Sequence, residues 1–229
     1  MIKLIKLNAL KRAWLFRYRK ILWKLGEMPM NKKEFLEIPL SDLVGDSSLP
    51  DPVTYQYYKN LKNRKIIINE EIGDNLLETA TLPFIEMDND GTGSPIEIII
   101  STVGGEIYSG FNLVDQIEKA KSPVTIHIMS MAASMGFLIA MAGKNNPNVK
   151  TVCHPFSVGL LHSGSQYMEG SAHAVKDTFD FSQHYEEKIK SYILTHTKID
   201  ENLYEKIERK EYWMDADEMK RLGIVDEII

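Results

Sequence analysis

The sequence has a single cysteine, Cys153, and no uninterrupted apolar run long enough to cross a membrane. One cysteine cannot form an intramolecular disulfide or a cysteine-based zinc site, and such sparing use of cysteine fits a reducing cytosol. A transmembrane helix needs about 18 or more consecutive apolar residues, and the chain offers none. We therefore expect a cytoplasmic protein.

Phosphate-binding patterns are also missing. There is no Gly-x-x-x-x-Gly-Lys-Ser/Thr and no Gly-x-Gly-x-x-Gly after a strand, so nucleotide binding has no support. No group of His, Asp and Glu has metal-ligand spacing, and we expect neither a metal nor a cofactor. With 229 residues, 44% hydrophobic and 26% charged, the chain suits one globular domain with an appendage.

Acidic residues are absent from positions 1–26, which hold eight Lys and Arg. The remaining residues hold 19 basic and 32 acidic side chains, a net charge of −13. Apolar side chains in this arm recur at three- and four-residue steps, which predicts a basic amphipathic helix ending near Gly26. Three interpretations stay open: docking on the acidic body or a neighbouring subunit, contact with an anionic membrane, and nucleic-acid binding through the arm alone. Because the body is acidic, we expect no nucleic-acid partner.

Residues 27–56 are rich in Pro, Ser and Asp and predict a linker, which leaves 57–229 as the main domain. In that domain, short β-branched segments alternate with segments of helical spacing as far as Gly143. This alternation predicts an α/β fold with parallel strands and right-handed crossovers. The predicted strands are 64–73, 96–105, 123–131, two within 149–162, and 224–229. The predicted helices are 74–90, 109–121, 134–143, 170–197, 200–210 and 215–223.

Ser134 lies between small residues at a predicted strand-to-helix junction, in the segment SMAASMGFLIAMAG. Its hydroxyl could cap a buried helix. Alternatively it is a nucleophile held at a helix N-terminus, where backbone N–H groups can stabilise an oxyanion. Of the six histidines, His162 is best placed to act as its general base, because it ends an apolar strand. Gly104 and Gly105 end another strand, where the backbone can approach a ligand.

Four segments occur in the order in which they occur in a known family: STVGGEIYSGFNLVDQI, SMAASMGFLIAMAG, KTVCHPFSVGLLH and ADEMKRLGIVDEI. Together they resemble the proteolytic subunit of the Clp protease, over residues 57–229. The resemblance implies a crotonase-like spiral of ββα units, here with an N-terminal helical extension, and a hydrolase, a serine endopeptidase with a Ser-His-Asp triad. By motif position Ser134 is the nucleophile and His162 the base. The amides of Gly105 and Met135 form the oxyanion hole, and Gly104 shapes the turn.

The resemblance also implies an assembly. Members of this family form rings that stack face to face around the active sites, and many take polypeptide substrates from ATP-driven unfoldases. We therefore expect a homo-oligomeric ring, a stacked double ring and an unfoldase partner. Peptide bonds of proteins and peptides would be hydrolysed inside that compartment, with no cofactor.

The third member of the triad departs from the family pattern, which has an Asp two residues before an aromatic residue. Here the aromatic residue is Trp213 and the matching position is Glu211, in a shortened segment. Glu208 and Asp215 are alternatives, and a solvated charge is a further interpretation of Glu211. Other functions therefore stay open: a phage-type Clp-like maturation protease, or a catalytically weak scaffold or regulatory ring subunit. An acyl-CoA enzyme, or a peptidase with a Ser-Lys dyad, would leave Ser134 or His162 unexplained.

Overall fold

The computed structural model describes residues 51–229. The predicted basic arm, 1–26, and the predicted linker up to residue 50 lie outside the described residues. The chain divides into two units, Met1–Lys62 and Asn63–Ile229. In the first unit the described part forms helix α3 (Pro52–Lys62), so residues 52–56, where we predicted the end of a linker, are helical. The second unit contains the sheet and the candidate site.

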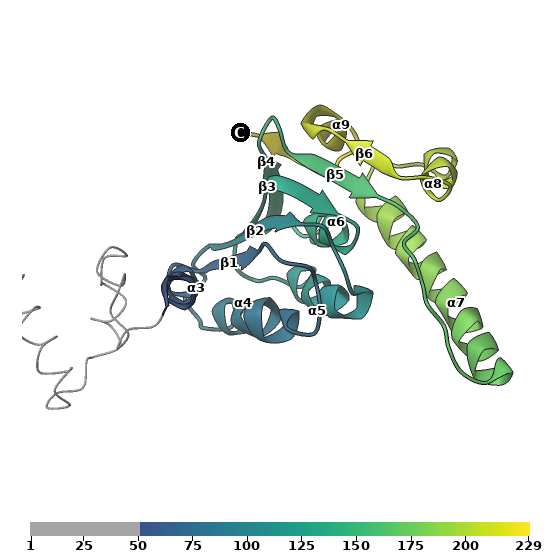
Figure 1. Ribbon diagram of the computed structural model, residues 1–229. Coiled ribbons are helices and arrows are strands. Elements are labelled where there is room, and N and C mark those ends of the chain that lie inside the picture. Colours follow the sequence, from purple (N-terminus) through teal and green to yellow (C-terminus); the bar gives the residue numbers. More distant parts are fainter. Residues whose placement is uncertain (1–50) are drawn as a thin grey trace, which may run out of the picture. The chain divides into compact units, whose positions relative to one another are not determined.

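Five strands of the second unit run parallel in the order β1-β2-β3-β4-β7 (Figure 1). They are β1 (Lys65–Ile68), β2 (Ile96–Thr102), β3 (Val124–Ala133), β4 (Val149–Cys153) and β7 (Glu227–Ile228). The prediction of an α/β fold with parallel strands is confirmed. In β2 every second side chain is buried, including those of Ile96, Ile98 and Ile100, because successive side chains of a strand point to opposite faces.

Strand β3 divides the sheet into two branches. Its first half pairs with β4, whereas its last residues, Met131–Ala133, pair in parallel with β5 (Val158–Leu161). A three-residue strand that we did not predict, β6 (Tyr212–Met214), then pairs antiparallel with β5. The branch matters for function because it brings the end of β5 alongside the end of β3.

The predicted helices are all present, with shorter bounds. The predicted helix 74–90 consists of a π-helical turn, η2 (Leu77–Thr81), followed by α4 (Leu82–Asp88). Figure 1 shows α4, α5 (Ile107–Ile117) and α6 (Met135–Ala140) on one face of the sheet, and α6 contacts both β2 and β3. The 25-residue helix α7 (Ala172–His196) extends away from the sheet, and α8 (Glu201–Ile207) and α9 (Ala216–Arg221) follow it.

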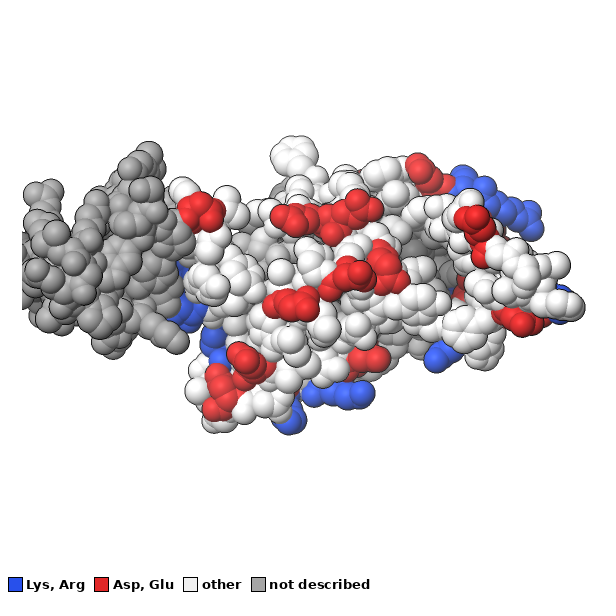
Figure 2. All heavy atoms as spheres, turned by 60° about the horizontal axis from the view of Figure 1, so that its bottom comes forward, with Lys and Arg blue, Asp and Glu red and all other residues white. Residues whose placement is uncertain are grey.

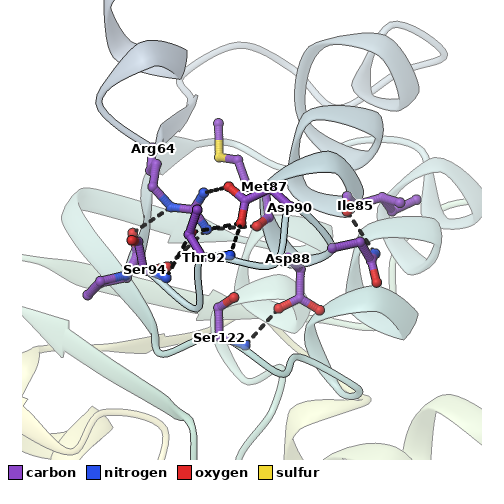
Figure 3. A network of polar contacts seen from close by, with 10 residues as sticks. Arg64, Ile85, Met87, Asp88, Asp90, Thr92, Ser94 and Ser122 are labelled. Carbon is purple, nitrogen blue, oxygen red and sulfur yellow. Dashed lines mark hydrogen bonds and ion pairs between the residues drawn. The ribbon is translucent and has the colours of Figure 1, made fainter.

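A polar network fixes the loop between α4 and β2 (Figure 3). The guanidinium of Arg64 forms an ion pair with Asp90 and donates a hydrogen bond to the carbonyl of Met87 at 2.7 Å. The carboxylate of Asp88 accepts a hydrogen bond from the backbone N–H of Ser122 at 2.7 Å. The loop is therefore tied both to the residue before β1 and to the segment before β3. These ties set the starting points of three neighbouring strands.

Candidate active site

Ser134 lies at the junction where β3 ends and α6 begins, with φ of 52° and ψ of −122°. A non-glycine residue in such a region carries strain of about 1–3 kcal/mol, and it persists only where the surroundings fix it. Here the N–H of Ser134 donates to the carbonyl of Leu160 at 2.9 Å, and its own carbonyl accepts from the N–H of Phe137 at 2.9 Å. The junction therefore holds Ser134 in a strained turn between a strand and a helix, as expected of a serine nucleophile.

The hydroxyl of Ser134 does not cap the helix. Ser134 occupies the N-cap position of α6, but its side chain makes no capping hydrogen bond. Within residues 51–229 its Oγ has no hydrogen-bond partner at all. The capping interpretation offered by the sequence is therefore not what the structure contains, and the half-buried hydroxyl is left available for other chemistry.

Because Gly104 has no Cβ, the loop after β2 can approach Ser134 more closely than it could with any other residue at this position. Its φ is 96°, and a Cβ added to it would lie 2.5 Å from the carbonyl oxygen of Ala133 and 2.7 Å from the Cβ of Ser134. The N–H of Gly104 is already used, since it donates to Oγ1 of Thr102 at 3.1 Å. Gly104 thus shapes the turn and does not supply a free amide.

Two backbone amides near Ser134 lack an acceptor in the described part of the chain: those of Gly105 and Met135. Gly105 forms an isolated parallel bridge with Ile72, in which the bonds run from Ile72 N–H to Gly104 and from Glu106 N–H to Ile72, each 2.8 Å long. Because successive peptide groups of an extended chain point to opposite sides, the Gly105 N–H points away from Ile72. Met135 is the first residue of α6, where an amide has no partner within the helix.

His162 follows β5 and lines the same cavity as Ser134. The pairing of Ala133 with Leu160 places the end of β5 beside the junction. No hydrogen bond joins the imidazole to the hydroxyl among residues 51–229. Hydrogen bonds of catalytic groups are often long in the free enzyme and tighten when substrate binds. The floor of the cavity is apolar and buried, and it is formed by Met135, Leu138, Leu161, Ile193, Tyr204 and Ile207.

The three carboxylates that the sequence offered as the third group lie in different surroundings. Glu211 is exposed, accepts a hydrogen bond from Nε1 of Trp213 at 3.1 Å, and does not line the cavity. Asp215 caps α9, because its Oδ1 accepts from the N–H of Glu218 at 2.8 Å. Glu208, at the end of α8, lines the cavity together with Ser134 and His162.

Sequence reasoning missed the contribution of α7. This helix supplies Glu186, Ile189 and Ile193 to the cavity wall. Their spacing of three and four residues places them on one helix face, which is a signal that the sequence contained. Nothing in the sequence, however, said which element that face would meet. Among residues 51–229 no group of His, Cys, Asp and Glu could hold a metal ion.

A half-buried polar cluster anchors the C-terminal end of α7 to the end of α5. His196 directs one ring nitrogen at the carboxylate of Glu118, 3.2 Å away, and the other at the carbonyl of Tyr192, 2.8 Å away. Both partners are acceptors, so the protonated imidazolium fits the site. The hydrogen bond to Glu118 raises the pKa of His196, against the opposing effect of burial. Burial also opposes ionisation of Glu118, but hydrogen bonds from His196, Gly143 and Tyr192 outweigh it and lower the pKa of that carboxyl.

The cluster predicts a pH-dependent stability. Because the pKa of His196 is raised, its contribution is complete below its usual value of 6.5 and is lost as pH rises through the folded-state pKa. The contribution of Glu118, whose pKa is lowered, is present above 4.5 and is lost as pH falls through the folded-state pKa. We expect His196→Gln to lower the free energy of unfolding by about 1–3 kcal/mol at pH 5.5 and by less at pH 8.5.

Urea unfolding of the full chain at the two pH values measures this difference. His173→Gln, at an exposed position near the start of α7, is the matched control and should leave both values unchanged. An equal loss at both pH values would show that His196 acts through packing alone.

The described structure is therefore an α/β protein in which a strained serine, a histidine and Met135, whose amide has no acceptor within residues 51–229, line one cavity. Comparison with known proteins identifies the family. The model of the Clp protease family matches residues 51–229, which is most of the chain. The chain belongs to the Clp protease family, and the crotonase-like fold class expected from the sequence is confirmed.

Individual relatives have low sequence identity to this chain, but the aligned segment covers most of both chains. The ATP-dependent Clp protease proteolytic subunit 1 of Salinibacter ruber is 25% identical over 169 residues, which are 74% of this chain and 71% of that protein. The proteolytic subunit from Streptococcus gordonii is 28% identical over 183 residues, covering 76% of this chain and 88% of that protein. None of the helices within residues 51–229 is both long and apolar enough to span a membrane.

Proposed function

We propose that the chain is a serine endopeptidase in which Ser134 attacks the peptide carbonyl. His162 accepts the hydroxyl proton and later delivers it to the leaving amine. The N–H groups of Gly105 and Met135 stabilise the oxyanion, and a donor of this kind is worth about 3–4 kcal/mol. The observation that carries the proposal is Ser134 itself, a strained and uncapped serine that shares a cavity with His162.

The carboxylate that orients His162 is the open part of this mechanism. Motif position assigns it to Glu211, whose hydrogen bond from Trp213 would have to be given up if the side chain turned toward His162. Glu208 would not have to turn in this way, since it already lines the cavity. A glutamate can orient a histidine in either case, provided that it reaches the second ring nitrogen.

The assembly and its partners belong to the same proposal. The relatives are named as proteolytic subunits of an ATP-dependent protease. We accordingly propose that the chain forms a homo-oligomeric ring in the cytoplasm, stacked in pairs, and receives polypeptides from an ATP-driven unfoldase. The basic arm, 1–26, would then be the part available for membrane contact.

One observation favours a second candidate, a catalytically weak ring subunit. Within residues 51–229 no carboxylate lies within ion-pair distance of His162. A subunit whose histidine is never oriented would assemble with relatives and support them without much hydrolysis of its own. The two candidates differ in the reactivity of Ser134, which can be measured directly.

The test is labelling of the assembled full-length protein with a fluorophosphonate probe, with the modified residue located by mass spectrometry. We expect labelling of Ser134 in the wild type and none in Ser134→Ala or His162→Ala. Glu211→Gln and Glu208→Gln, made separately, show which carboxylate orients the histidine, because only that variant should label slowly. A folded, oligomeric wild type that does not label would contradict the protease proposal and favour the weak subunit.

A further inference from the structure

The cavity beside Ser134 has an acidic mouth. Its ionisable lining residues are His162, Glu186, Tyr204 and Glu208, and no Lys or Arg is among the described residues that line it. Both glutamates are exposed, whereas the apolar floor is buried. The cavity thus changes from apolar at its base to negatively charged at its rim.

Glu186 is held at this rim by a neighbour of His162. Nε2 of Gln166, in the segment after His162, donates a hydrogen bond to Oε1 of Glu186 at 3.1 Å. A neutral amide fixes the carboxylate without cancelling its charge. The segment that carries His162 and the helix that carries Glu186 therefore meet at the cavity mouth through a contact that preserves the negative charge.

The negative charge also affects Tyr204, a residue of the cavity floor. Burial raises the pKa of Tyr204 to about 12, and the charges of Glu208, Glu186 and Glu187 act in the same direction. The basic side chain of Lys190 lies over the Tyr204 ring, but it is paired with Glu201 at 2.9 Å and does not line the cavity. Acidic side chains also prevail over the centre of the face shown in Figure 2, with basic side chains nearer its edges.

We propose that this cavity binds the side chain of the residue whose carbonyl Ser134 attacks, and that it prefers lysine or arginine. The inference rests on the proposed peptidase function and names its substrate class. A long side chain can lay its methylene groups on the apolar floor and keep its charged end in the solvated mouth, near Glu186 and Glu208. A purely apolar side chain would use only the floor, and an acidic one would be repelled by both glutamates.

The expected preference is moderate because the carboxylates are exposed. Each exposed ion pair changes a rate or binding constant by a few-fold, so two together favour lysine over an apolar side chain of similar length by about tenfold. The preference should weaken with added salt, since exposed charges are screened over about 10 Å at 0.1 M. A preference based on shape alone would not depend on salt.

The experiment compares two fluorogenic peptides that differ only at this residue, lysine in one and norleucine in the other. We expect the assembled wild type to show a kcat/KM ratio of about ten in favour of lysine at low salt, and a smaller ratio in 0.5 M NaCl. Glu186→Gln should lower the ratio about threefold, and the double variant with Glu208→Gln should bring it close to one. Asp177→Asn is the control, because it removes one exposed negative charge from the same helix away from the cavity.

The ratio separates specificity from catalysis, so a general loss of rate in Glu208→Gln does not affect the conclusion. Hydrolysis of both peptides with a ratio near or below one in the wild type would overturn the inference and leave the peptidase intact. If neither peptide is cut and the probe does not label, the peptidase proposal fails. The affinities of Ser134→Ala for the two peptides, measured by fluorescence anisotropy, then decide the inference: tighter binding of the lysine peptide supports it, and equal binding overturns it.

Discussion

Ser134→Ala is expected to lower kcat for peptide hydrolysis by about 10⁴-fold or more, and His162→Ala by a similar factor. The hydroxyl is a poor nucleophile until the imidazole removes its proton, and without the hydroxyl the imidazole has no proton to remove and deliver. Because the two groups act as one unit, the double variant should be no slower than either single variant. Hydrolysis rates of purified oligomers measure this non-additivity.

Ser163 and His184 serve as controls for this experiment. Ser163 follows His162 and also lines the cavity, so Ser163→Ala removes a hydroxyl from the same place without touching the proposed nucleophile. His184 is exposed on α7 and does not line the cavity, and His184→Ala should leave the rate unchanged. If the losses from Ser134→Ala and His162→Ala instead multiplied in the double variant, the two residues would act independently and the proposed proton transfer would be wrong.

The α/β class was predictable because its strands are indicated by residues that are adjacent in the sequence. Strand β2 contains isoleucine at Ile96, Ile98, Ile99 and Ile100, and a β-branched run next to a glycine pair has few alternatives to a buried strand. The helices that cover it have apolar residues at helical spacing. These signals come from neighbours in the sequence, so no knowledge of the tertiary structure was needed to read them.

Features that depend on distant contacts were not predictable in the same way. Strand β6 has three residues, too few for any periodicity, and exists because β5 offers an edge to Tyr212–Met214. The sequence proposed Ser134 and His162 through motif position, but it could not show that the hydroxyl leaves the helix uncapped. The acidic rim is a further case, since Glu186 lies on α7 and Glu208 directly after α8, and the two line one cavity only in the folded chain.

Gly104→Ala is expected to destabilise the fold by about 3 kcal/mol or more and to lower kcat at least about 100-fold. An alanine there must adopt φ near 96°, and its Cβ would lie 2.5 Å from the carbonyl oxygen of Ala133. Backbone cannot move aside as a flexible side chain can. The loop must therefore retreat from the junction, and the retreat displaces Ser134 or the Met135 amide, which lies only 3.0 Å from the added Cβ.

Gly91→Ala separates the two causes of this loss. Gly91 also has a positive φ, 77°, but a Cβ added to it meets nothing within 4 Å. It should cost only the backbone strain, about 1–2 kcal/mol, and leave kcat unchanged. Denaturant unfolding and hydrolysis rates of both variants give the comparison. If Gly104→Ala lost no more than Gly91→Ala, the close approach of this loop would not set the geometry of the site. If it lost stability but kept kcat, the oxyanion donors would have to be sought away from the end of β2.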